Sequence, residues 1–157
     1  MEEQDNPKQK MLLALQARVH QTSDEGRQSQ WEKRKQKGFN SARENLALLC
    51  ETQTFQEYGQ FAVAAQRKRK DYESLKSDTA ADGVFTGVCY VNEGHFPSSQ
   101  TATALVINDY SVLAGTQGYF HHLKLDRIIE VAKQRLLPVI MFAAAILAKA
   151  VASKPNY

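Results

Sequence analysis

The sequence predicts a mixed α/β domain, and three observations support this prediction. Residues 84–91 are rich in β-branched and aromatic side chains, which favour a strand. Residues 119–135 repeat apolar side chains at spacings near three and four, which is typical of an amphipathic helix. Apolar strand patterns lie on both sides of this helix, at 103–108 and 137–142. A strand, a helix and a strand in this order predict a parallel pair of strands joined by a crossover helix.

Length and composition fit one domain. The chain has 157 residues, with 20 basic and 17 acidic side chains, and its net charge of +3 does not indicate nucleic-acid binding. Cys50 and Cys89 form no CxxC pair, so we expect reduced thiols and neither a zinc site nor a disulfide. No export signal is visible, and the apolar stretch 136–148 is shorter than the ~20 residues of a membrane span. We therefore expect a cytoplasmic protein without a membrane segment.

Residues 1–37 are predicted to form a polar, helical N-terminal arm. Apolar side chains at Leu12, Leu15 and Val19 favour a helix, and the charged stretch that follows is expected to be weakly ordered. Trp31 lies among basic residues in this stretch, which suggests either a nucleic-acid contact or packing on a neighbouring subunit. A single aromatic residue is weak evidence for nucleic-acid binding, and we expect none.

After the arm, the sequence predicts a short helix and a basic loop. Ser41 and Glu44 form a capping box, in which each side chain accepts a hydrogen bond from a backbone amide at the helix start. The helix is expected to span 42–50, and a brief strand or turn is expected at 55–58. The run 67–70 reads Arg-Lys-Arg-Lys without apolar periodicity. Such a run is either a solvated surface or a site for phosphate groups or an acidic partner.

The second half of the chain should contain the sheet and its main helix. We expect the strands 84–91 and 103–108 to pair antiparallel, although their connection is longer than a tight hairpin needs. The helix 119–135 is expected to bury an apolar face that includes Leu123 and Ile129. We expect His121 and Lys124, among other polar side chains of this helix, to lie elsewhere on the surface.

A short glycine-containing turn, residues 114–118, lies where a strand leads into this helix. Backbone amides at such a helix start can contact an anionic or carbonyl-bearing ligand. His121 and His122 follow and suggest a base or a metal site, but no acidic or cysteine partner stands at ligand spacing. We therefore expect a solvated or core-edge histidine pair and no metal ligand.

Five segments, in their order and spacing, resemble the N-terminal half of the carboxyltransferase component of biotin-dependent acyl-CoA carboxylases. These segments are residues 41–49, 55–57, 82–87, 108–118 and 137–140. The resemblance implies a crotonase-like fold of stacked β-β-α units that binds acyl-CoA. In that family a carboxyl group moves from carboxybiotin to the α-carbon of the acyl thioester.

The resemblance also implies an organisation, ligands and partners. It covers residues 38–142, which we interpret as a partial N-terminal carboxyltransferase domain between the arm and a divergent tail, 143–157. The implied ligands are acyl-CoA and the carboxybiotin of a partner, with no covalently bound cofactor. The implied partners are the biotin carboxyl carrier and biotin carboxylase components, and a homo-oligomer is expected.

Candidate acyl-CoA or substrate contacts gather at the turn and on the following helix. They are Ala114, Gly115, Gln117, Gly118 and Lys124. No catalytic residue is assigned. In the family a glycine-rich segment that forms an oxyanion hole follows the strand matching 138–142, and a second hole lies in a C-terminal domain.

The tail departs from the family at this point, because residues 143–157 contain no glycine. We hypothesise a truncation or a reading-frame shift, since codons for residues 144–149 read one nucleotide earlier can encode Gly-Gly-Asn-Pro-Gly-Gln. The DNA sequence tests this hypothesis. We expect the chain alone to be inactive as a carboxyltransferase. The alternative function is a non-catalytic acyl-CoA-binding or assembly domain.

Overall fold

The computed structural model describes residues 6–50 and 54–143, and it contains a four-stranded sheet in the order β1-β2-β3-β4. The strands are β1 (Gln56–Tyr58), β2 (Val84–Tyr90), β3 (Ala102–Asn108) and β4 (Val139–Phe142). β2 pairs antiparallel with β1 and β3, whereas β3 pairs parallel with β4. The predicted antiparallel pair and the predicted parallel crossover are both confirmed, and the fold is mixed α/β.

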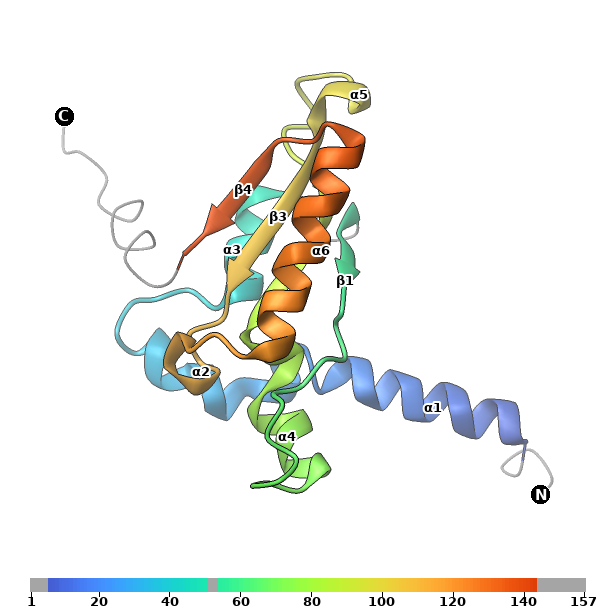
Figure 1. The fold of residues 1–157 in the computed structure, drawn as a ribbon, viewed down its shortest axis with the longest axis vertical. Helices are drawn as coiled ribbons and strands as arrows, with labels where there is room; N and C mark the ends of the chain where they lie inside the picture. Colours follow the sequence, from blue (N-terminus) through green and yellow to red (C-terminus); the bar gives the residue numbers. More distant parts are fainter. Residues whose placement is uncertain (1–5, 51–53, 144–157) are drawn as a thin grey trace.

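Helices cover both faces of the sheet (Figure 1). On one face, α6 (Tyr119–Arg135) packs against β2 and β3 through an aliphatic cluster. On the other face, α3 (Ala42–Leu49) packs against β3. The strands are therefore buried on both sides, which explains why β2 and β3 are almost continuously apolar and do not alternate with polar residues.

Helix α6 has the predicted bounds and buries Ile128, Val131 and Ala132 as predicted, but the rest of its buried face differs. Its buried positions, from His121 and Lys124 to Ile128, recur at the three- and four-residue spacing that faces β2 and β3. Leu123 and Ile129, which we expected in the core, lie off this stripe and are 46% and 50% exposed. The prediction of surface positions for His121 and Lys124 is therefore wrong.

The N-terminal arm is helical beyond its predicted first helix. It contains α1 (Pro7–His20), the 3₁₀ turn η2 (Glu25–Arg27) and α2 (Gln28–Lys35). The expectation of a weakly ordered second half is wrong, because tertiary contacts hold it in place. The Trp31 indole N–H donates to the carbonyl of Asp24 at 2.9 Å, and Arg27 forms a buried ion pair with Asp109 at 2.6 Å. In contrast, α1 has no buried residue and projects from the body (Figure 1).

The capping box of α3 is confirmed. The Glu44 amide donates to the Ser41 hydroxyl at 2.9 Å, and the Ser41 amide donates to the Glu44 carboxylate at 2.8 Å. The brief strand expected at 55–58 is also present, as β1. The capping box therefore marks the start of α3 directly from local sequence.

The described part of the chain also contains two short helices and the 3₁₀ turns that precede β2 and α6. The helices α4 (Tyr72–Asp78) and α5 (Ser98–Thr101) were not predicted. Helix α4 forms because Asp71 caps the Ser74 amide at 2.9 Å and Leu75 inserts fully into the core. The 3₁₀ turns η4 (Ala80–Gly83) and η5 (Leu113–Gly115) precede β2 and α6. Among the described helices, none is long and apolar enough to cross a membrane.

Candidate functional site

The turn predicted to contact ligand lies at the surface, between β3 and α6. Ala114 and Gln117 are exposed, and Gly115 and Gly118 are half-buried. Three consecutive residues of η5 have positive φ, with values of 46° at Leu113, 53° at Ala114 and 79° at Gly115. Left-handed backbone is unfavourable for residues other than glycine, and clusters of it are found where function or tertiary packing requires it.

The turn already uses part of its own backbone. The Gly115 amide donates to the carbonyl of Val112 at 2.9 Å, and the Thr116 amide donates to the carbonyl of Leu113 at 3.1 Å. The side chain of Gln117 is exposed, and its amide can both donate and accept a hydrogen bond with an external ligand.

The start of α6 is capped from within the protein. The His121 amide donates to the Asp82 carboxylate at 2.8 Å. A Cβ on Gly118 would lie 3.0 Å from the same carboxylate, so the close approach requires glycine. The sequence suggested that the positive end of the α6 dipole could bind an anionic ligand. The Asp82 carboxylate of the protein itself occupies that position. Burial raises the pKa of the Asp82 carboxyl, against the lowering effect of the His121 amide.

Lys124 lies inside the protein, 6% exposed, and its ammonium group is turned towards η4. It donates to the carbonyl of Ala81 at 2.9 Å and also to that of Val84. Burial lowers the pKa of Lys124 to about 8, while the nearby carboxylates of Glu57 and Asp82 oppose the shift. Lys124 was predicted to contact a ligand, but its ammonium group bonds to the buried turn η4, which lies beside the turn 114–118.

The two histidines of α6 have different environments. His121 is 1% exposed, and burial lowers the pKa of its imidazole. Its Nδ1 lies 3.3 Å from the carbonyl of Asp82, and His122 is exposed. The predicted solvated or core-edge pair is therefore wrong for His121. Within the described residues, no group of three histidine, cysteine or acidic side chains could hold a metal ion.

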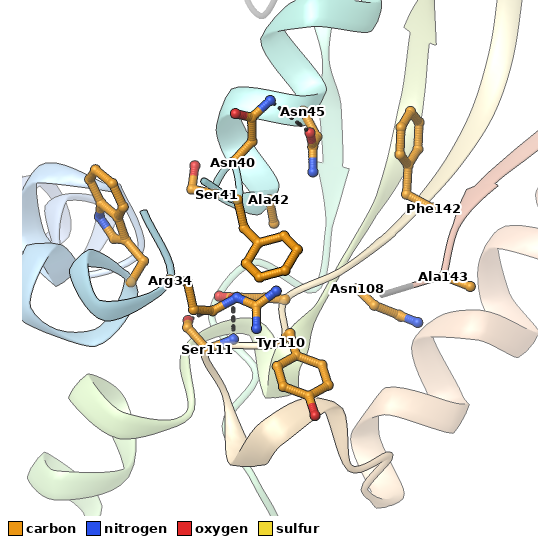
Figure 2. Close-up of a pocket in the computed structure, with 13 residues that line it drawn as sticks. Arg34, Asn40, Ser41, Ala42, Asn45, Asn108, Tyr110, Ser111, Phe142 and Ala143 are labelled. Carbon is orange, nitrogen blue, oxygen red and sulfur yellow. Dashed lines mark hydrogen bonds between the residues drawn. The ribbon is translucent and has the colours of Figure 1, made fainter. Parts of the chain in front are cut away.

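Sequence reasoning missed a pocket at the carboxyl ends of β3 and β4, where ligands of open α/β sheets commonly bind (Figure 2). Its cavity volume is ≈ 30 Å³, about the space of one water molecule, and the hollow around it totals ≈ 500 Å³ including space open to solvent. It is lined by Trp31, Arg34, Phe39, Asn40, Ser41, Ala42, Asn45, Asn108, Asp109, Tyr110, Ser111, Phe142 and Ala143. These residues come from the arm, α3, the β3–η5 connection and the end of β4. Some of these residues were given other roles from the sequence, such as helix capping for Ser41, but none was predicted to line a pocket.

Arg34 and Tyr110 join this pocket to the turn. The Arg34 guanidinium lies 4.9 Å from the ring centre of Phe39 and 4.4 Å from that of Tyr110 (Figure 2). A Cβ on Gly115 would lie 2.8 Å from the Tyr110 ring. Tyr110 therefore contacts both the pocket and the glycine turn. Asn108 also lines the pocket, and its buried Oδ1 has no hydrogen-bond partner among the described residues.

Comparisons with known proteins identify solved structures of the same fold. No protein-family model and no curated protein matches the sequence. A single-chain, multi-domain long-chain acyl-CoA carboxylase is 40% identical over 84% of this chain, with a TM-score of 0.82. The transcarboxylase 12S hexamer, solved with hydrolysed methylmalonyl-CoA bound, is 24% identical over 87% of the chain, with a TM-score of 0.64. The β subunit of P. aeruginosa geranyl-CoA carboxylase is 18% identical over 88%, with a TM-score of 0.54.

The first of these matches carries the family assignment, and the two less identical ones support the fold alone. The chain spans 13% of the long-chain acyl-CoA carboxylase, 25% of the transcarboxylase chain and 22% of the geranyl-CoA carboxylase subunit. It corresponds to one segment of longer proteins. The chain belongs to the carboxyltransferase family of acyl-CoA carboxylases, as the five sequence segments predicted.

Proposed function

We propose that this chain is the acyl-CoA-binding part of a biotin-dependent carboxyltransferase. The observation that carries the proposal is the 40% identity to a long-chain acyl-CoA carboxylase over 84% of the chain, at a TM-score of 0.82. In the proposed reaction, carboxybiotin of a partner gives up its carboxyl group to the α-carbon of an acyl thioester. We expect the chain by itself to bind acyl-CoA and to lack transfer activity.

The proposed binding surface combines the turn 114–118 with the pocket at the ends of β3 and β4. The thioester oxygen becomes negatively charged when its α-carbon loses a proton, so donors must surround it. Gln117 is exposed two residues after Gly115, which lies against the pocket residue Tyr110, and its side-chain amide can donate a hydrogen bond. Gly115 and Gly118 allow Tyr110 and Asp82 to pack against the turn, and Ala114 leaves its exposed side small, so the pantetheine arm can pass close to the backbone there. In this scheme β2, β3 and α6 form one β-β-α unit of a crotonase-like stack.

Lys124 takes a positioning role in this proposal. Its ammonium group bonds to the carbonyl of Ala81 within η4 and to that of Val84 directly after it, and Asp82 of η4 caps the start of α6. Lys124 therefore fixes the backbone that holds Gly118 and the turn in front of it. Its effect on acyl-CoA would be transmitted through η4, without direct contact in this conformation.

The partners of the proposed function follow from the reaction. They are a biotin carboxyl carrier, a biotin carboxylase and further copies of the chain in a cytoplasmic homo-oligomer. Residues 38–142 would form the partial carboxyltransferase domain and residues 1–37 the arm. The tail hypothesis concerns residues 143–157, of which 144–157 lie outside the described residues.

Calorimetric titration with acyl-CoA thioesters of short and long chain length tests the binding claim. Gln117→Ala should weaken acyl-CoA binding about fivefold, since one neutral hydrogen bond to the ligand is worth ~1 kcal/mol. Gln134→Ala is the matched control, because Gln134 bonds only to Glu130 on the exposed side of α6. Absence of binding at millimolar acyl-CoA would contradict the proposal.

An activity assay separates the enzyme from the alternative. The chain, and a version extended through the restored reading frame, would be mixed with carboxylated biotin carrier and acyl-CoA. Carboxyl transfer by the extended protein alone supports the proposed function. A folded extended protein that binds acyl-CoA without transfer supports the non-catalytic acyl-CoA-binding or assembly domain.

A further inference from the structure

The two cysteines of the chain lie together in the core, at the end of α3. Cys50 is the C-cap residue of α3, and Cys89 is the next-to-last residue of β2. Both belong to the same core cluster, in which Cys50 is 7% exposed and Cys89 is fully buried. Both are free thiols. The fold therefore brings together two thiols from distant parts of the sequence.

The two thiols interact, and the interaction makes them unequal. The Cys50 thiol donates to the carbonyl of Leu46 at 3.6 Å, which leaves its sulfur free to accept. Burial raises the pKa of the Cys50 thiol, and the hydrogen bond from Cys89 opposes this shift. Burial also raises the pKa of Cys89, and there the Cys50 sulfur adds to the shift. Cys50 is therefore the thiol that ionises first, and the thiolate is the reactive form.

Cys50 also lines a groove that opens to solvent. This groove has a cavity volume of ≈ 310 Å³ and lies at the opposite end of α3 from the pocket of Figure 2. It is formed by the last residues of α3 and by the loop after β2, which contributes Asn92 and His95. Cys89 is not among the described residues that line it. A small molecule in the groove therefore meets the Cys50 thiol first, with Cys89 behind it.

We propose that Cys50 and Cys89 form a reversible intramolecular disulfide when hydrogen peroxide enters this groove. First, the Cys50 sulfur attacks one peroxide oxygen, the O–O bond breaks, and the thiol proton leaves with the other oxygen as water. The Cys89 sulfur then attacks the sulfur of the Cys50 sulfenic acid, the S–O bond breaks, and the hydroxyl leaves with the Cys89 proton as a second water. The two thiols lose two electrons, and the peroxide gains them. The reaction is independent of acyl-CoA and of carboxyl transfer.

Peptide mapping of the folded chain after treatment with hydrogen peroxide tests the disulfide. Digestion without reductant should give one peptide with Cys50 cross-linked to one with Cys89, and dithiothreitol should separate them. After treatment and unfolding, neither cysteine should react with iodoacetamide. Two thiols that still react with iodoacetamide, or a disulfide that joins two chains, would overturn the proposal.

The roles of the two thiols have their own test. In Cys89→Ala the Cys50 sulfenic acid has no partner thiol, so dimedone should trap it. In Cys50→Ala the buried Cys89 should react with peroxide about tenfold more slowly than Cys50 does in Cys89→Ala. Equal rates in the two variants would overturn the assignment of Cys50 as the first thiol. Thermal melting checks that each variant is folded.

Access through the groove is tested with a matched pair of substitutions. Ala47→Phe adds a ring to the groove and should slow disulfide formation several-fold, because the rate depends on access to the sulfur. Ala14→Phe adds the same ring to α1, which has no buried residue, and should leave the rate unchanged. Equal rates in the two variants would mean that peroxide does not reach Cys50 through the groove, and this part of the proposal would be wrong.

Discussion

Two turns of this protein share a strained backbone but differ in what surrounds them. In both η4 and η5, three consecutive residues have positive φ, and glycine is only the last of the three. The angles are 54°, 47° and 72° at residues 81–83 and 46°, 53° and 79° at residues 113–115. The three residues of η4 are buried, whereas η5 lies at the surface with Ala114 exposed. Each non-glycine residue in this conformation costs about 1 kcal/mol or more.

The surroundings explain how each turn is held. Within η4, the Ala81 carbonyl accepts from Lys124 and the Asp82 carboxylate accepts from the His121 amide. Its strain is offset by the protein's own side chains, and these bonds fix the start of α6. The η5 turn has its own backbone bonds and the Tyr110 ring against Gly115. The comparison indicates that η4 is a structural support and that η5 is the turn available to a ligand.

The largest expected effect comes from the side chain that links η4 to α6. Asp82→Ala removes the helix cap, places alanine in left-handed backbone and takes a carboxylate away from Lys124. We expect a loss of about 4 kcal/mol in unfolding free energy, because the cap contributes ~1 kcal/mol and an uncompensated buried charge contributes more. Asp82→Asn also removes the charge but keeps an acceptor oxygen and tolerates positive φ, so it should cost about 2 kcal/mol. Chemical denaturation measures both values, and equal losses for the two variants would contradict the capping role.

The next effect is a pH dependence that originates at Lys124. Its pKa falls from 10.5 to about 8 in the folded protein, so between these values the unfolded chain binds the proton and the folded protein does not. The free energy of unfolding should therefore rise between about pH 8 and pH 10.5. This rise should exceed that of the Lys124→Met variant by on the order of 3 kcal/mol. Groups facing the ammonium are Glu57, Asp82 and Arg43.

Denaturation profiles across this pH range test the effect. The exposed Lys133→Met variant is the control and should run parallel to the unmodified protein. If the pH profile of the Lys124→Met variant is also parallel to that of the unmodified protein, Lys124 has an ordinary pKa. The interpretation that Lys124 is buried against η4 would then be wrong.

Much of the fold was predictable because local sequence determines it. The bounds of α6 follow from its apolar period, and the start of α3 follows from the Ser41 and Glu44 capping box. The side chains that hold η4 were not predictable in this way. Lys124 was expected at the surface because its partners, the carbonyls of Ala81 and Val84, lie about 40 residues earlier in the chain. A periodic pattern within one helix contains no information about such distant acceptors.

The candidate site was predicted in part. The turn 114–118 is visible from its glycines, but its environment depends on distant segments. The pocket of Figure 2 brings Arg34 of the arm against Tyr110 after β3, and it includes Phe142 at the end of β4. Sequence spacing does not place these three residues together. The basic run 67–70 was noticed, but three of its residues line a groove together with Phe120, which lies about 50 residues later.

The smallest expected effect tests the comparison of the two turns most directly. Ala81→Gly and Ala114→Gly both relieve left-handed backbone strain, which stabilises the folded protein by about 1–1.5 kcal/mol. Both also raise the conformational entropy of the unfolded chain, which lowers stability by ~0.4–1 kcal/mol. Ala114 is exposed, so its replacement should stabilise the protein by about 0.5 kcal/mol. Ala81 is buried in the core cluster, and loss of its methyl contact costs a further ~0.8 kcal/mol, so its replacement should destabilise by about 0.3 kcal/mol. Opposite signs in matched denaturation curves are expected because the Ala81 methyl is packed in the core and the Ala114 methyl is exposed; equal signs would contradict this contrast between η4 and η5.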